Sequence, residues 1–181
     1  QQAKASTPKP ASPGAKPTTK TPWDDSTQAL ARNTLQTGSQ QLGVALSEAQ
    51  TDALIGYLGL LHKWSKVYNL TAVRDPLEMV TLHLLDSLAV VPALLRHLDT
   101  PANRPAQPMR LLDVGSGAGL PGVVIAIACP HIQVTCLDAV AKKAAFVQQV
   151  AASLGLTNLR GLHQRIEYMD TAHAVVCSRA F

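Results

Sequence analysis

The sequence predicts an α/β fold in which a helical region is followed by a parallel, doubly wound sheet. Two observations predict it. Between residues 110 and 178, short apolar runs of strand length alternate with segments of helical spacing, the order found in parallel sheets with right-handed crossovers. Before residue 100, apolar residues instead recur every three or four positions, as in amphipathic helices. In sheets of this class, ligands bind at the carboxyl ends of the strands.

Composition divides the chain into three parts. Residues 1–26 form a tail rich in Lys, Pro, Ala, Thr and Ser, which cannot bury enough apolar area to fold and is predicted to be disordered. Residues 27–108 form the helical region, ending in a proline-rich linker, and residues 109–181 form the sheet domain. Four of the 16 basic residues lie within the first 22 positions, so the formal net charge of +4 belongs to the tail. It gives no argument that the body binds nucleic acid.

The three cysteines form no C-x-x-C pair and lie in apolar surroundings, which indicates core packing in a reducing compartment. No charged-then-apolar leader opens the chain, and the longest apolar runs, Leu88–Leu95 and Gly122–Cys129, are much shorter than a membrane span. We therefore expect a cytoplasmic protein without a membrane segment. No cluster of His, Cys, Asp or Glu predicts a metal site.

The first two helices are predicted over residues 26–43 and from residue 48 to about residue 68. Ser47 and Gln50 have the spacing of a capping box at the start of the second helix. Its apolar stripe consists of Leu54, Leu58, Leu61 and Trp64.

A third helix is predicted to begin at Asp75-Pro76, with proline in its first turn. The residues expected to face the core are Met79, Leu82, Leu85 and Leu88. His83 and Asp86 are three positions apart and share a face, either as a structural polar group or as part of an active-site rim.

In the sheet domain the predicted strands are residues 110–114, 133–137, 159–163 and 174–177. The predicted helices are residues 121–128 and 141–154, the second ending at Gly155 in a left-handed cap. A doubly wound order places the fourth strand beside the first, in the centre of the sheet. We therefore expect that the last strands of the sheet are missing from this sequence.

A glycine-rich turn, Gly115-Ser116-Gly117-Ala118-Gly119, joins the first strand to the helix that follows it. Glycine allows a sharp turn and a close approach of the backbone to a ligand. We expect a ligand here to meet unpaired N–H groups at the start of that helix. The turn is therefore the predicted cofactor site.

Two kinds of cofactor fit this turn. Residues 117–122 match the G-x-G-x-x-G pattern of dinucleotide-binding proteins. However, Asp113 lies two residues before Gly115, where its carboxylate would repel a pyrophosphate and attract a ligand that carries a sulfonium and an ammonium group. Asp138, at the end of the next strand, is placed to accept hydrogen bonds from two ribose hydroxyls. Together the two acids favour S-adenosyl-L-methionine over a dinucleotide.

Several separate stretches carry a more specific resemblance. They are Leu61–Trp64, Tyr68–Thr71, Arg74–Pro76, His83–Ser87, Asp113–Gly122, Leu137-Asp138 and Ser178–Phe181. In this order, over residues 47–181, they resemble the GidB/RsmG family of methyltransferases, which act on 16S ribosomal RNA. The glycine turn alone indicates only a methyltransferase, and the other stretches make the resemblance specific.

The resemblance implies a Rossmann-like, S-adenosylmethionine-dependent methyltransferase sheet that the family completes beyond residue 181. It implies methyl transfer from S-adenosyl-L-methionine to N7 of a guanine in 16S ribosomal RNA, as naked RNA or in a small ribosomal subunit particle. The alternatives are a methyltransferase for a small molecule or protein and an inactive, truncated remnant.

The predicted cofactor-binding residues are Gly115, Gly117, Leu120, Asp138, Ile166, Glu167 and Arg179. By resemblance, the backbone around Gly115 and Leu120 contacts the cofactor, Ile166-Glu167 lies on its adenine side, and Arg179 lines the pocket. Arg179 also has Asp113 or an RNA phosphate as possible partners. Because guanine N7 carries a lone pair and needs no deprotonation, no catalytic general base is expected and catalysis is positional.

Overall fold

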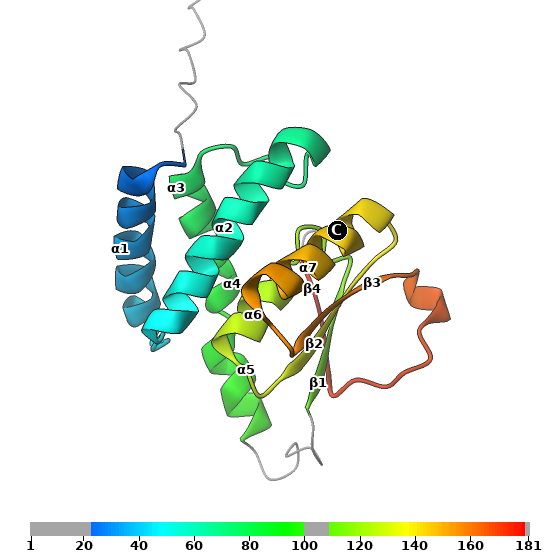
Figure 1. Cartoon of the computed structure of the whole chain (residues 1–181). Helices are drawn as coiled ribbons and strands as arrows, with labels where there is room; N and C mark the ends of the chain where they lie inside the picture. Colours follow the sequence, from blue (N-terminus) through cyan, green and yellow to red (C-terminus); the bar gives the residue numbers. More distant parts are fainter. Residues whose placement is uncertain (1–22, 100–108, 180–181) are drawn as a thin grey trace, which may run out of the picture.

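The computed structural model describes residues 23–99 and 109–179 (Figure 1). Its elements are α1 (Asp25–Gln41), α2 (Glu48–Tyr68), α3 (Pro76–Met79), the π-helix η1 (Val80–Leu85), α4 (Asp86–Leu88), α5 (Val91–Leu98), β1 (Arg110–Val114), α6 (Gly122–Ala128), β2 (Gln133–Asp138), α7 (Ala141–Leu154), β3 (Leu159–His163), the 3₁₀-helix η2 (Ile166–Tyr168) and β4 (Val175–Ser178). The predicted tail up to residue 22 and most of the predicted linker lie outside the described residues. Helix α1 includes the last two residues assigned to the tail.

The four described strands form a parallel sheet in the order β3-β2-β1-β4, which confirms the predicted α/β fold. Strand bounds agree with the prediction to within one residue. At the carboxyl edge, Val114 of β1 pairs with Leu137 of β2 on one side and with Ser178 of β4 on the other. The glycine turn that follows Val114 therefore lies between the ends of β2 and β4.

Helices α6 and α7 lie over the sheet, α2 packs against both of them, and α1 packs outside α2 (Figure 1). The aromatic ring of Phe146 on α7 packs against Tyr57 and Trp64 of α2, with ring centroids 6.3 and 5.4 Å apart. Buried residues of the helical region and of the sheet domain thus belong to a common hydrophobic cluster. The division of the chain into a helical region that ends at residue 108 and a sheet domain that begins at residue 109 stays a prediction.

The capping box at the start of α2 is confirmed, and one of its residues has a second role. Gln50 N–H donates to Ser47 Oγ (3.2 Å), and Ser47 N–H donates to Gln50 Oε1 (2.9 Å). The Gln50 amide nitrogen also donates to the carbonyl oxygens of Ile127 and Ala128, both at 3.0 Å. One side chain therefore caps the start of α2 and the end of α6, and so fixes the helical region on the sheet domain.

The third predicted helix differs from the prediction in its register. Met79 and Leu88 are buried as expected, but Leu82 is 49% exposed and Leu85 is only partly buried. Leu84, which the spacing did not select, is fully buried instead. The assignment of Leu82 to the core was therefore wrong.

The cause is the π-helix η1 in the middle of this segment. In an α-helix the Asp86 N–H would donate to the Leu82 carbonyl. Here it donates to the carbonyls of Thr81 and His83, so the turn is wider and the register shifts. Propensity gave no signal for this, because the segment reads as an ordinary apolar helix.

The stretch 76–98, which contains η1, is long and apolar enough by composition to cross a membrane. Its buried residues, such as Val80 and Leu84, belong to the hydrophobic cluster described above. A core helix passes the same test of length and hydropathy, so the finding is weak evidence for a membrane span.

Gly161 in β3 provides a test of how closely α7 packs on the sheet. A Cβ at this position would lie 2.5 Å from the Ala144 carbonyl oxygen and 3.1 Å from the Gln148 backbone nitrogen. Both are helix backbone atoms, so α7 would have to move. We expect Gly161→Ala to lower the free energy of unfolding by about 3 kcal/mol in urea denaturation. Gly56→Ala, which meets only the end of the Leu154 side chain, is the control, and an equal loss there would contradict the packing argument.

Candidate functional site

The glycine turn adopts a backbone conformation that requires glycine. Gly115, Gly117 and Gly119 have φ values of 66°, 57° and 87°, in the left-handed region. At Gly119 the space is also closed, because a Cβ would lie 2.4 Å from Val123 Cγ2. At Gly117 an added Cβ would meet nothing nearer than 4.0 Å, so the lack of a side chain leaves room above the turn.

The backbone N–H groups of the turn donate largely within the protein. Those of Gly115 and Ser116 donate to the Leu137 carbonyl at 2.9 and 3.1 Å. Those of Gly119 and Leu120 donate to the Ser116 carbonyl at 2.8 and 3.0 Å. The turn is therefore held to β2 and to itself.

The start of α6 is satisfied in the same way. Gly122 N–H donates to Asp113 Oδ2 at 2.8 Å, and Val123 N–H donates to the Gly119 carbonyl at 2.7 Å. The expectation that a ligand meets unpaired N–H groups here was wrong for these residues. A pyrophosphate needs such donors, so this geometry disfavours the dinucleotide alternative.

Asp113 lies beneath the turn and is fully buried. Burial raises the pKa of its carboxyl group from 3.8 to about 6, opposed by the hydrogen bond from Gly122, by the thiol of Cys177 and by the charge of Arg179. The buried carboxylate fixes the first turn of α6 against the end of β1. A Cβ at Gly122 would lie 2.8 Å from Asp113 Oδ2, which shows how tight the contact is.

This raised pKa predicts how stability depends on pH. Because the folded state holds the Asp113 proton more tightly than the unfolded state, the contribution of this group to stability falls as pH rises from about 4 to about 6 and is constant above that. Asn carries no charge at either pH. We expect the difference in unfolding free energy, Asp113→Asn minus unsubstituted protein, to increase by about 3 kcal/mol between those limits. A pH-independent difference in urea denaturation would contradict the assignment.

Asp138 is the last residue of β2, and its carboxylate contacts the glycine turn. Its Oδ2 accepts from Gly117 N–H at 2.9 Å and its Oδ1 accepts from Val140 N–H at 2.8 Å. Lys143 Nζ lies 3.8 Å from Oδ2. Each carboxylate oxygen can accept a further hydrogen bond, so Asp138 shapes the turn and keeps acceptor capacity for a ligand.

A cavity of about 150 Å³ opens at the carboxyl ends of β1 and β2. It is lined by Val114, Gly115, Leu137, Asp138, Ala139, Gln164, Arg165, Ile166 and Glu167. Four of the seven predicted site residues therefore surround one space, although they lie on three separate segments of the chain. The cavity is small and mainly apolar, with the Asp138 carboxylate at its edge.

Two other predicted residues adjoin this cavity through the turn. Gly117 is tied to Asp138, and Leu120 is buried at the end of the turn. Sequence reasoning missed Tyr57, whose hydroxyl donates to the Ala118 carbonyl at 2.8 Å from within α2. Tyr57 was not in the predicted apolar stripe of α2, and no pattern in the sequence indicated this contact. The helical region therefore helps to hold the glycine turn.

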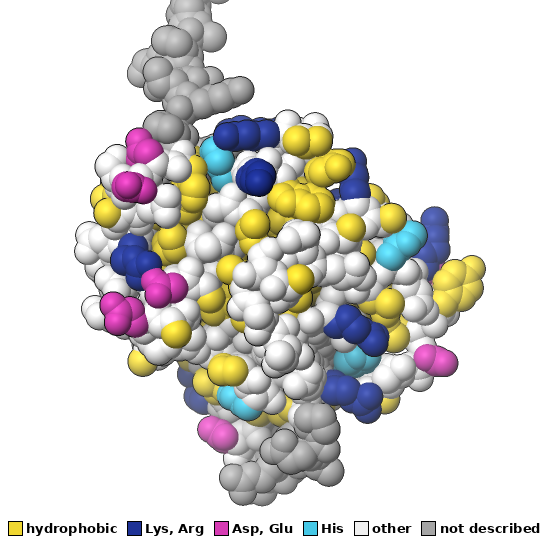
Figure 2. Space-filling model, viewed as in Figure 1, with side chains coloured by type: hydrophobic (Ala, Val, Ile, Leu, Met, Phe, Trp, Pro, Cys, Tyr) yellow, Lys and Arg dark blue, Asp and Glu magenta, His cyan; other side chains and the backbone are white. Residues whose placement is uncertain are grey.

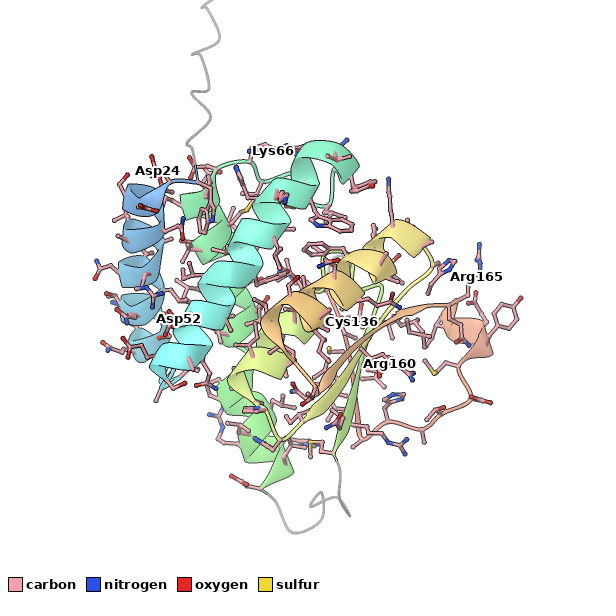
Figure 3. All side chains as sticks on the ribbon, in the orientation of Figure 1. Asp24, Asp52, Lys66, Cys136, Arg160 and Arg165 are labelled. Carbon is pink, nitrogen blue, oxygen red and sulfur yellow. The ribbon has the colours of Figure 1, made fainter. Side chains whose placement is uncertain are left out.

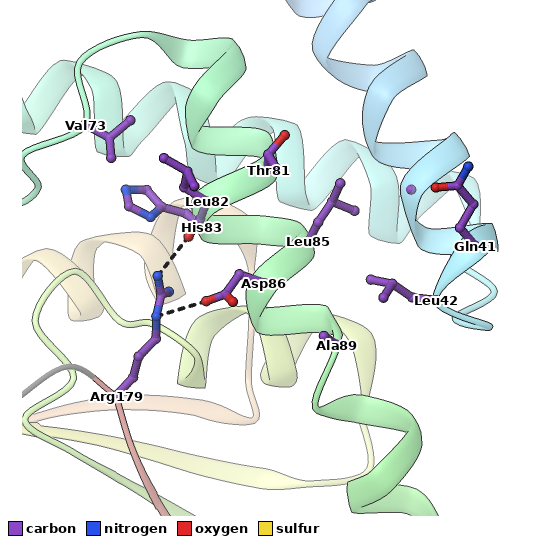
Figure 4. Close-up of a pocket in the computed structure, with 11 residues that line it drawn as sticks. Gln41, Leu42, Val73, Thr81, Leu82, His83, Leu85, Asp86, Ala89 and Arg179 are labelled. Carbon is purple, nitrogen blue, oxygen red and sulfur yellow. Dashed lines mark hydrogen bonds and ion pairs between the residues drawn. The ribbon is translucent and has the colours of Figure 1, made fainter.

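Arg179 lies apart from the small cavity, just after β4. Its Nη2 donates to the Leu82 carbonyl at 2.8 Å, and its Nε lies 3.2 Å from Asp86 Oδ2 (Figure 4). Its Nη1 donates to Ser87 Oγ at 3.4 Å. Leu82 is the carbonyl that the π-helix releases from the Asp86 N–H. The irregular helix thus supplies a backbone acceptor for the guanidinium.

His83 and Asp86 have separate partners. His83 Nε2 lies 2.8 Å from Thr71 Oγ1, and burial lowers the pKa of the imidazole, which is therefore neutral at pH 7. Asp86 is exposed and pairs with Arg179. The partner of His83 supports the structural interpretation for that residue, whereas a rim position for Asp86 stays a prediction.

The charges on the surface are unevenly placed. In Figure 2, most acidic side chains in view lie over α1 and the start of α2, with one basic side chain among them, whereas most Lys and Arg side chains lie over the end of α2 and the opposite side. Figure 3 shows Arg160 and Arg165 on the side of β3 and η2, away from Asp24 and Asp52. Within residues 23–99 and 109–179, no group of three or more His, Cys, Asp or Glu side chains is arranged to hold a metal ion.

The chain is similar to proteins of one family. The family model for rRNA small subunit methyltransferase G (GidB) matches residues 50–181. The ribosomal RNA small subunit methyltransferase G of Polaromonas naphthalenivorans (strain CJ2) is 57% identical over 155 residues, which cover 86% of this chain and 69% of that protein. The protein of the same name from Acidovorax sp. (strain JS42) is 59% identical over 151 residues, which cover 81% of this chain and 66% of that protein. The chain thus spans about two thirds of the length of these relatives.

Among solved structures, coclaurine N-methyltransferase bound to N-methylheliamine and SAH aligns over 84% of this chain and 49% of that one. The sequences are 17% identical and the TM-score is 0.38.

Proposed function

This chain belongs to the family of rRNA small subunit methyltransferase G, and we propose that it transfers a methyl group from S-adenosyl-L-methionine to N7 of a guanine in 16S ribosomal RNA. The cofactor assignment rests on two features that lie together: the glycine turn, whose N–H groups are mostly bonded within the protein, and the small cavity at Asp138. The turn offers few free N–H groups to a phosphate, while the small, mainly apolar cavity beside Asp138 suits an adenine ring.

In this proposal each site residue has a positional role. The backbone at Gly115, Gly117 and Leu120 holds the methionine end, Asp138 accepts from the ribose hydroxyls, and Ile166 and Glu167 close the adenine side. The bound cofactor supplies an activated methyl group on a sulfonium. The protein aligns the acceptor with that group and excludes water.

The acceptor needs no general base, because guanine N7 presents its lone pair in the plane of the ring. The acidic side chains that line the small cavity are Asp138 and Glu167. In this proposal both contact the cofactor, and neither removes a proton. In this proposal Arg179, which directly follows β4, lies at the rim of the active site. We place the reaction in the cytoplasm, with the small ribosomal subunit or its RNA as the partner.

The proposal is tested in cells from which the gene has been deleted. We expect N7-methylguanine in 16S RNA to disappear from one position and to return with the intact gene, measured by chemical cleavage and primer extension. Purified protein, labelled S-adenosyl-L-methionine and either naked 16S RNA or small subunits then identify the substrate form. Unchanged methylation in the deletion strain would reject the assignment.

A further inference from the structure

A groove of about 760 Å³ lies between the last turn of α1, the π-helix η1 and Arg179 (Figure 4). This volume is within the ~300–1,000 Å³ typical of small-molecule sites. Its walls are contributed by Gln41 and Leu42 at the end of α1, by Leu82 and Leu85 of η1, and by Ala89 just after α4. Arg179 closes the side nearest the sheet.

The groove adjoins the proposed cofactor site across the carboxyl edge of the sheet. Ser178 pairs with Val114, so Arg179 and Gly115 follow directly after two neighbouring strand ends. The small cavity occupies the β1–β2 side of this edge, at Asp138. The β4 side, where the groove begins, is therefore the side from which a second reactant can approach.

The walls of the groove expose apolar side chains. Leu82 is 49% exposed because the π-helix turns it out of the core. Together with Leu42 and Leu85 it gives an apolar surface suited to the faces of a planar ring. π-Helical turns occur frequently at functional sites.

Asp86 gives the groove a specific polar edge. Its side chain is 58% exposed although its Oδ2 pairs with Arg179, so the carboxylate remains open to a ligand. A carboxylate only accepts hydrogen bonds at neutral pH, and it repels phosphate. The N1–H and exocyclic N2–H groups of guanine are donors, whereas adenine lacks donors at these two positions. N7 lies on the opposite edge of the purine, so it stays free when N1 and N2 are held.

We propose that this groove receives the acceptor guanine, with Leu82 against its face and Asp86 accepting from its N1–H and N2–H groups. The inference rests on the proposed function. It adds a base-binding site on η1 and a residue, Asp86, that selects guanine.

The test fills the groove without touching Arg179. Ala89→Trp places a large ring in one wall, and Gln41→Trp places one in the other wall. In the full-length protein, we expect both to leave the Kd for S-adenosyl-L-methionine within about twofold by calorimetry and to slow single-turnover methylation of small subunits by about 10-fold or more. Ala152→Trp, on the exposed face of α7, is the matched control and is expected to methylate normally.

Methylation at the normal rate by folded Ala89→Trp and Gln41→Trp proteins would overturn the groove assignment while leaving the proposed function intact. If the unsubstituted protein methylates no RNA, the proposed function fails, and the groove assignment fails with it. The first result is measured in the two Trp variants and the second in the unsubstituted protein, so the two failures can be distinguished.

The role of Asp86 is tested with small subunits in which inosine, which lacks the N2 amine, replaces the target guanine. Losing one hydrogen bond to a carboxylate should slow methylation by the unsubstituted protein by about 10-fold. Asp86→Asn should be slower on guanine and should lose the discrimination between guanine and inosine. Equal rates on the two bases with unsubstituted protein would exclude Asp86 as the selecting group.

Discussion

Replacing Asp138 with Ala is expected to raise the Kd for S-adenosyl-L-methionine by about 100-fold, a loss of about 2.7 kcal/mol. Two effects combine. The variant removes the proposed acceptor for the ribose hydroxyls, and it leaves the N–H groups of Gly117 and Val140 without the carboxylate that now receives them. Titration calorimetry measures the affinity. Lys143→Ala, which removes only the 3.8 Å ion pair with Asp138, is the control and should change Kd by less than about threefold.

The two effects of Asp138 can be separated with a ligand change. If Asp138 accepts from the ribose, S-adenosylhomocysteine without its 2′ and 3′ hydroxyls should bind the unsubstituted protein more weakly than the parent compound. Asp138→Ala should bind both equally. If the unsubstituted protein also binds both equally, Asp138 only shapes the turn and the ribose assignment is wrong.

Arg179→Lys is expected to lower kcat/KM for methylation by about 30-fold although the charge is kept. The guanidinium contacts the Leu82 carbonyl, the Asp86 carboxylate and the Ser87 hydroxyl, all on one helical segment. A lysine ammonium is a single point and cannot occupy the same three directions. The side chain would lose its fixed place between the two proposed binding sites. Steady-state kinetics with small subunits give the measurement.

The control for Arg179 is another arginine that pairs with an aspartate. Arg32 on α1 pairs with Asp52 on α2 at the surface, far along the helical region from the glycine turn. Arg32→Lys is expected to leave kcat/KM unchanged within about twofold. A similar loss in both variants would show that Arg179 contributes only to folding.

The sheet domain could be predicted closely because its signals are local. Alternating apolar strands and helices set the bounds of β1, α7 and β3, and glycines with a following proline located the turn. The placement of β4 beside β1 followed from the general winding of such sheets. The grouping of Gly115 with Asp138 followed because parallel strands end at a common edge.

The remaining features depend on contacts between distant segments. Nothing near Tyr57 in the sequence indicates that its hydroxyl reaches Ala118, and nothing near Gln50 indicates that its amide caps α6. The free N–H groups predicted at the start of α6 were wrong because Asp113 and Gly119 bind two of them. An isolated helix has unpaired N–H groups, but a buried one must satisfy them from the surrounding fold.

The π-helix has a consequence for how this protein tolerates insertions and deletions. A π-turn holds one residue more than an α-turn, so deletion of a single residue within 80–85 would restore a regular α-helix. Because the π-turn takes up its extra residue within one turn, the side chains after it would keep about the same direction relative to the core. The hydrogen bonding would change instead, since a regular α-helix uses the Leu82 carbonyl as the acceptor for an N–H four positions later, in competition with Arg179. A one-residue deletion here should therefore spare the fold more than it spares the position of Arg179.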